Sequence, residues 1–365
     1  MNIDLAEAVA GRNPKAYAEA HGQFVSHQLD RFAALTASLH AADRPSFEQL
    51  TEAVAVANPL DVERVVTAPV VTRRLRTTAW KNPVRFADDV ATFLLTERAS
   101  RGEAHVDSEK WTALGDTLVH PDGSLTTPIS VPGLRAVDIA SPQALAMNAE
   151  TSLCEEQSRP SPAEDTVRLV GSRLKTAVAR MEEISPALRN LVSTCVLSLV
   201  VSEDPALQFS SSSHGLFVGR VALAARAWES APLTSFVDAL VHESIHCMLL
   251  MLDRQSPLLI DDLKADALPP VISPWTGTPL TVPAYVHAIM VWFGLAHFWR
   301  DAHETSAFPT EESTAMLRRA LRGFENCDVV ARMLPEAYPI LPDRTVHSLT
   351  VMQSQVRDLM SSALR

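Results

Sequence analysis

One histidine-rich segment of this 365-residue chain has residue types and a spacing that could do chemistry. It reads His242-Glu243-Ser244-Ile245-His246, an H-E-x-x-H motif. In a helix, positions i and i+4 lie one turn apart on one face, so both imidazoles can reach a single metal ion. Glu243 is rotated by about 100° from His242 and can lie beside the metal without binding it. There it could polarise a bound water, move a proton or orient a ligand, so we expect it to be the catalytic residue.

Two imidazoles hold a catalytic metal poorly, so we expect a third protein ligand. The residues after His246 are Cys-Met-Leu-Leu-Met-Leu, which excludes the G-x-x-H continuation of metzincins. The next thirty or so residues contain no Glu, which argues against a thermolysin-like site. We favour His287, because it lies in the first turns of an otherwise apolar predicted helix that follows a Pro-rich loop. The alternatives that stay open are His297, His303, Asp261 and Asp262.

The elements around the motif must position these ligands. Pro232 opens a predicted helix that runs to about Leu252 and carries the motif. A predicted strand at Leu216–Ala224 precedes it, after a loop at Ser210–Gly215. A strand followed by the motif helix is the context that metal sites of this type require. Pro283 opens a second long helix to about Ala302, which carries His287.

Apolar residues at helical spacing dominate the rest of the chain. Thr117–Thr126 contains a Pro-Asp-Gly turn between two short β-prone runs and predicts a hairpin. Leu188–Val201 is strongly apolar and fits either a buried helix or a strand, because periodicity alone does not separate the two. The other predicted helices are Pro14–Leu39, Ser46–Ala57, Pro83–Arg98, Ala163–Ile184, Thr310–Met333 and Asp343–Leu364.

These patterns predict an α+β fold that is predominantly helical, with a small β-sheet supporting a zincin-like, metal-binding helix. The Glu-, Ser- and Pro-rich stretch Cys154–Ala163 looks like a surface connection. We divide the chain into a helical N-terminal region at 1–107, a hairpin and connecting region at 108–160, and a catalytic region at 161–365.

Composition narrows the function classes. Apolar residues make up 47% of the chain, which is enough for a sizeable core. The net charge of -11 argues against non-specific nucleic-acid binding. Four scattered cysteines suggest no disulfide framework, and the N-terminus lacks the pattern of a signal peptide. No apolar stretch reaches the roughly 18 residues of a membrane span, so we expect a cytoplasmic protein without a membrane partner.

The motif and its downstream context resemble one known family. Ser273-Pro274-Trp275, Pro279-Leu280 and Val286-His287-Ala288 follow Leu240-Val241-His242-Glu243-Ser244-Ile245-His246. This arrangement is similar to the αKG-HExxH-type peptide β-hydroxylases, H-E-x-x-H proteins of natural-product gene clusters, and the similarity covers most of the chain. The N-terminal helices match least.

The resemblance implies an Fe(II), 2-oxoglutarate-dependent oxygenase that hydroxylates the β-carbon of a side chain in a ribosomally made precursor peptide. It implies that His242, His246 and His287 are metal ligands and that Glu243 is the motif glutamate. The chain departs from the expected pattern in the loop after Trp275, where Thr-Gly-Thr stands in place of a basic residue.

A 2-oxoglutarate-dependent enzyme needs a cation for the distal carboxylate of its cosubstrate. Arg220, Lys264 and Arg300 are the sequence candidates, and Trp275 is a candidate site-lining residue. The first alternative function is a zinc metallopeptidase in which Glu243 is the general base. The second is a helical binding module without enzymatic activity. The apolar content of the last helices allows a homodimer.

Overall fold

The computed structural model describes residues 4–142, 163–204, 206–254, 256–260, 267–333 and 340–363. The chain is mostly helical, with 60% helix and 9% strand in small sheets, which confirms the predicted α+β class with a predominance of helix. The helices are α1 (Leu5–Val9), α2 (Lys15–Ala42), α3 (Arg44–Val56), α4 (Pro59–Thr67), α5 (Pro69–Thr77), α6 (Pro83–Ala99), α8 (Glu164–Ile184), α9 (Pro186–Cys195), α10 (Leu233–Asp253), α12 (Val282–Glu304), α13 (Thr310–Asn326) and α15 (Asp343–Ala363). The strands are β1 (Lys110–Trp111), β2 (Leu118–Val119), β3 (Leu125–Thr126), β4 (Val137–Asp138), β5 (Ser198–Glu203), β6 (Phe209–Ser213), β7 (Arg220–Ala225), β8 (Val271–Ile272) and β9 (Pro279–Leu280).

The chain folds into two compact units, each built from separated segments. The first unit comprises residues 1–20, 177–192 and 234–365, and it contains both helices that carry the candidate ligands. The second comprises residues 21–176 and 193–233. The three-part division of the sequence at 107 and 160 stays an interpretation of composition.

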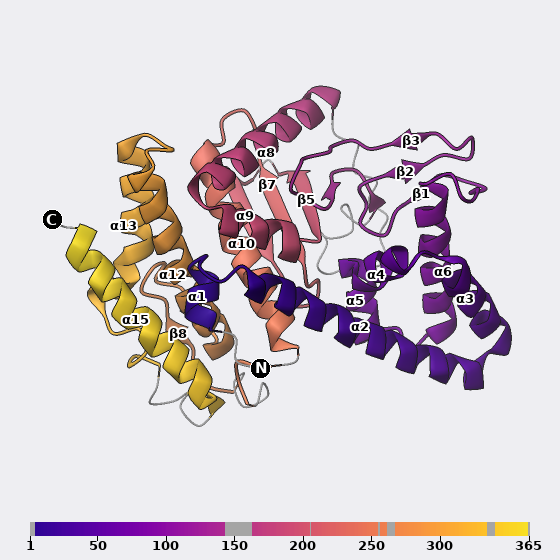
Figure 1. Ribbon diagram of the computed structural model, residues 1–365, viewed down its shortest axis with the longest axis horizontal. Coiled ribbons are helices and arrows are strands. Elements are labelled where there is room, and N and C mark those ends of the chain that lie inside the picture. The colour runs from indigo at the N-terminus through magenta and orange to yellow at the C-terminus, as the bar shows by residue number, and fades with distance from the viewer. Residues whose placement is uncertain are drawn as a thin grey trace. The chain divides into compact units, whose positions relative to one another are not determined.

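The second unit holds a four-stranded sheet in the order β4-β5-β7-β6. Figure 1 labels its two central strands, β5 and β7. β4, β5 and β7 run parallel, and β6 pairs antiparallel with β7 at the edge. The predicted loop at Ser210–Gly215 is therefore wrong over its first four residues, because a serine-rich edge strand needs only backbone pairing to one neighbour. The predicted strand at Leu216–Ala224 begins later, at Arg220, after a turn in which Gly219 adopts a φ of 82°.

Two more sequence predictions are resolved in this part of the chain. The ambiguous run Leu188–Val201 contains most of helix α9 and most of strand β5, so neither single assignment was right. The predicted hairpin is confirmed, because β2 and β3 pair antiparallel with Leu118 opposite Thr126. β1 adds a third strand to that hairpin.

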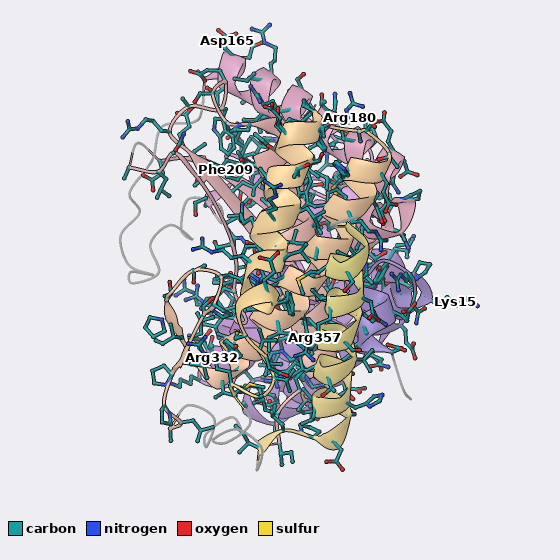
Figure 2. The ribbon with its side chains drawn as sticks, turned by 90° about the vertical axis from the view of Figure 1, so that its left-hand side faces the viewer. Lys15, Asp165, Arg180, Phe209, Arg332 and Arg357 are labelled. Carbon is teal, nitrogen blue, oxygen red and sulfur yellow. The ribbon has the colours of Figure 1, made fainter. Side chains whose placement is uncertain are left out.

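The first unit is a cluster of helices with the metal motif on α10. Helices α12, α13 and α15 lie side by side and contact one another, and α1 packs against α12 and α15 (Figure 1). At the surface, Arg357 on α15 pairs with Asp328, with 3.0 Å between nitrogen and oxygen (Figure 2). The predicted helix at Thr310–Met333 is shorter in the structure and ends at Asn326.

α10 and α12 are long and apolar enough to cross a membrane when judged by length and composition alone. In each helix, however, 78% of the apolar window is buried inside the molecule. The largest fully buried side chains include Phe236 on α10 and Tyr285, Phe293 and Trp299 on α12. Burial of this kind is typical of helices that form a protein core.

Gly294 allows α12 to approach α10 and α1 closely. A Cβ at this position would lie 2.6 Å from Ile245 Cδ1 and 2.8 Å from the carbonyl oxygen of Val9. We therefore expect Gly294→Ala to lower the free energy of unfolding by about 1–3 kcal/mol through overpacking. Gly22→Ala is the control, because nothing lies within 4 Å of its added Cβ and alanine favours the helix by about 1 kcal/mol. Urea titration of both variants measures the difference, and equal stability of the two would contradict this close approach.

Candidate metal centre

Two helices position the candidate ligands. α10 begins directly after Pro232 and is apolar around the motif, with Leu240, Val241 and Ile245 fully buried. α12 begins at Val282, where the Thr281 hydroxyl accepts a hydrogen bond from the backbone N–H of Ala284. An N-cap and a proline in the first turn fix where this helix starts. His287 therefore lies near the beginning of α12, as the sequence predicted.

The structure brings the motif residues together. One ligand atom from each of His242, Glu243 and His246 lies within 4.8 Å of the other two. The rings of His242 and His246 have centroids 5.0 Å apart. The two histidines are half-buried, and the Glu243 side chain between them is buried. The one-turn spacing of the motif thus produces the clustered donors that the sequence predicts.

His287 joins the motif through His246. The Nδ1 atoms of the two residues lie 3.3 Å apart, and their rings are nearly parallel with centroids separated by 5.5 Å. A separation of this size is what two nitrogens would have if each lay about 2.1 Å from one shared ion. His287 is not part of the cluster of His242, Glu243 and His246, whose ligand atoms all lie within 4.8 Å of one another, as judged over the described residues. His287 therefore contacts this cluster through His246.

Burial keeps two of these imidazoles neutral. It lowers the pKa of His246 well below its usual value, and the neighbouring rings of His242 and His287 lower it further. Burial also lowers the pKa of His287 to about 4, although the carboxylate of Asp253 acts in the opposite direction. A neutral imidazole has one nitrogen with a free lone pair, whereas imidazolium has none. At neutral pH both side chains are therefore in the form that can bind a metal.

The donor set fits a divalent transition metal. Imidazole nitrogens suit zinc, copper, iron and nickel, and a set of two histidines and one carboxylate is typical of non-haem iron sites. Here two motif histidines, a third histidine and a buried carboxylate are available. These residues would hold the ion and still leave part of its coordination sphere to reactants.

An aromatic wall adjoins the motif. The Trp292 ring lies perpendicular to the His242 ring, with centroids 6.1 Å apart. Trp275 stacks on Trp292 at 5.8 Å, and its Nε1 donates a hydrogen bond to the carbonyl oxygen of Ala320. A Cβ on Gly323 would lie 2.2 Å from the Trp275 ring, so α13 packs directly against it. Trp275 is thus a packed core residue that reaches the motif through the ring of Trp292. Its site-lining role stays a prediction.

The other predicted residues lie elsewhere. Arg300 pairs with Asp301 and Glu304, and it follows His287 by thirteen positions, about 20 Å along the helix axis. Arg220 belongs to the second unit, where its guanidinium lies 5.2 Å from the centre of the Phe217 ring. Burial lowers the pKa of Arg220 to about 10. Lys264, Asp261 and Asp262 lie outside the described residues.

Sequence reasoning missed three residues around the motif: Asp238, Trp292 and Arg319. Asp238 precedes His242 by four positions, so it shares the face of α10 that carries both motif histidines. That four-residue spacing could have shown from the sequence that Asp238 lies near the motif. Trp292 and Arg319 have no local signal, because their places depend on how α12 and α13 pack.

His297, an alternative ligand in the sequence, instead contacts Arg12. The Arg12 guanidinium donates to its Nδ1 at 3.3 Å, so the hydrogen is on Nε2, which is buried and has no hydrogen-bond partner in the described part of the chain. His303 Nδ1 lies 3.2 Å from the Ser313 hydroxyl. Both histidines therefore serve contacts within the helix cluster.

The neutral, buried imidazole of His297 predicts that the fold loses stability in acid. Burial, together with Arg12 and Arg300, lowers the pKa of His297 to about 3. Its contribution to stability is therefore complete above the unfolded pKa of about 6.5, and it is lost as the pH falls below that value, because the unfolded chain takes up the proton first. Between pH 7 and pH 5 this one residue should reduce the free energy of unfolding by about 2 kcal/mol.

Urea titrations at both pH values, on the wild type and on His297→Gln, measure this effect. The variant should lose about 2 kcal/mol less than the wild type between pH 7 and pH 5. His347→Gln is the control, because His347 is exposed on α15, and it should keep the wild-type dependence. The same acid dependence in all three proteins would show that His297 is not responsible.

Comparison with known proteins adds no family to this picture. No protein-family model matches the chain, and no curated protein is significantly similar to it. The interpretation of the site therefore depends on its residues and their geometry.

Proposed function

We propose that the chain is an Fe(II), 2-oxoglutarate-dependent oxygenase, with a zincin-like motif helix, that hydroxylates a side-chain β-carbon of a ribosomally made precursor peptide. One observation carries the metal part of this proposal: the Nδ1 atom of His287, from a separate helix, lies 3.3 Å from that of His246. Metal binding by a motif of this kind needs a third protein ligand, and this contact supports His287 as that ligand. The resemblance of the motif and its downstream segments to the peptide β-hydroxylases supports the choice of reaction.

The side chains have distinct roles in this proposal. His242, His246 and His287 would hold the iron, which together with 2-oxoglutarate and O₂ would supply the oxidising power for breaking a C–H bond. Buried Glu243 would orient the metal-bound groups through hydrogen bonds. The apolar residues of α10 and the rings of Trp292 and Trp275 would limit the access of bulk water to the site.

The substrate and setting follow from the resemblance. A precursor peptide is the proposed partner, and the cytoplasm, where such peptides are made, is the proposed location. A basic peptide would be attracted by the net charge of -11. We propose no nucleic-acid or membrane partner, and a homodimer is compatible with the apolar terminal helices.

Anaerobic reconstitution with Fe(II) tests the function. The loaded protein, exposed to O₂, should convert 2-oxoglutarate to succinate, and mass spectrometry should show that a precursor peptide encoded beside its gene gains one oxygen atom. Peptide cleavage that needs zinc and no 2-oxoglutarate would instead establish the metallopeptidase, for which Glu243 is suitably close to both motif histidines. A chain that binds no metal would support the non-enzymatic binding module.

A further inference from the structure

We propose that Arg319 on α13 receives the distal carboxylate of the cosubstrate, an assignment that rests on the proposed function. The loop after Trp275 has no basic residue, and the structure places Arg300 far along α12 from His287. A basic side chain on another helix of the first unit could supply the cation instead. Arg319 suits this role for two reasons. It contacts Asp238 and Trp292, which are neighbours of the motif, and among the described residues it keeps hydrogen-bond donors beyond the one that Asp238 engages.

Two contacts join Arg319 to residues that neighbour the motif. Its Nη2 atom lies 3.2 Å from Oδ2 of Asp238, which precedes His242 by one helical turn, about 6 Å along the axis. Its guanidinium carbon lies 5.2 Å from the centre of the Trp292 ring, and that ring stands edge to face with His242. Both routes lead from Arg319 to the same motif histidine. The rise of about 6 Å from Asp238 to His242 is on the scale of a small dicarboxylate that chelates the metal at one end.

Arg319 is held in place but remains accessible. Asp238 is nearly buried, with 10% of its side chain exposed, and its other oxygen accepts a hydrogen bond of 2.7 Å from Trp299 Nε1. This fixed carboxylate and the Trp292 ring therefore position the guanidinium. The Arg319 side chain is 52% exposed, so a ligand can reach it from solvent.

The guanidinium has donors to spare. Arginine carries five N–H groups in a fixed fork, which suits a carboxylate that binds through both oxygens. Asp238 engages Nη2, and Nη1 makes only a weak contact of 4.0 Å with the Met316 sulfur, among the described residues. A second carboxylate can thus bind without breaking the ion pair that orients the side chain.

A pair of ligands tests the contact between Arg319 and the distal carboxylate separately from metal binding. 2-Oxoglutarate and 2-oxopentanoate share the metal-chelating keto-acid group, but the second carries a methyl group in place of the distal carboxylate. Anaerobic calorimetry of the Fe(II)-loaded protein gives both dissociation constants without any turnover. The wild type should bind 2-oxoglutarate at least 30-fold more tightly, because a charge-assisted, two-pronged contact is lost with the methyl group.

Arg319→Gln should weaken 2-oxoglutarate binding by about 30- to 100-fold and leave 2-oxopentanoate binding within about threefold. Arg318→Gln is the matched control, because Arg318 is an exposed neighbour on the same helix, and it should keep both wild-type affinities. Arg319→Lys keeps the charge without the fork, so it should lie between the wild type and the glutamine variant. It also serves as the test if the glutamine variant does not fold.

Two results for the variants would overturn the assignment. Arg319→Gln could weaken both ligands equally, which would mean that Arg319 acts only by supporting Trp292, or it could change neither. A wild-type protein that binds Fe(II) but no 2-oxoglutarate is a separate outcome. That result would overturn the proposed function itself, and the assignment of Arg319 with it.

Discussion

His246→Ala is expected to abolish both metal binding and turnover. His246 is the only one of the three candidate ligands that the structure shows in contact with both others, at 5.0 Å between ring centroids for His242 and 3.3 Å between Nδ1 atoms for His287. Its loss leaves two candidate imidazoles on separate helices, His242 on α10 and His287 on α12. Metal affinity should therefore fall by more than the roughly 10–100-fold that follows removal of a second-shell partner.

The fold should survive this change. His246 is neutral at pH 7 because burial lowers its pKa, so the substitution leaves no unpaired charge in the interior. Metal content after reconstitution and the thermal unfolding midpoint are measured on the same samples, with His347→Ala as the control on an exposed face of α15. Full iron loading and normal turnover in His246→Ala would remove the motif from the proposed function.

The motif could be predicted from the sequence because its geometry is local. Four residues separate the two histidines, and a helix places such residues on one face whatever else the chain does. His287 required one further step, the recognition of a second apolar helix that begins at a proline. The contact between His246 and His287 agrees with that reasoning.

The place of Arg319 beside Trp292 and the division into two units could not be predicted, because each depends on how distant segments pack together. Arg319 is one of several charged residues on an amphipathic helix, and only its contacts with Asp238 and Trp292 distinguish it. Each unit is assembled from distant segments, so a change of composition along the chain gives no sign of them. Strand β6 was missed for a related reason, because Ser210 to Ser213 lack the alternating pattern that marks a strand with one buried face.

Glu243→Gln is expected to separate metal binding from catalysis. The substitution keeps the size of the side chain and removes its negative charge. If three histidines hold the iron, iron affinity should stay within about tenfold of the wild type, since a second-shell change has a limited effect. Turnover should fall by at least about 100-fold, because a carboxylate that orients groups or moves a proton is lost.

The same variant decides the composition of the ligand set. Glu243 lies in the cluster whose ligand atoms are all within 4.8 Å of one another, so it is close enough for a direct role to be tested. Equilibrium iron binding and single-turnover succinate formation are measured side by side for Glu243→Gln and His246→Ala. If the glutamine variant loses iron to the same extent as the alanine variant, Glu243 is itself a ligand, and the site has two histidines and one carboxylate. If it keeps iron and full turnover, the carboxylate has no part in the chemistry.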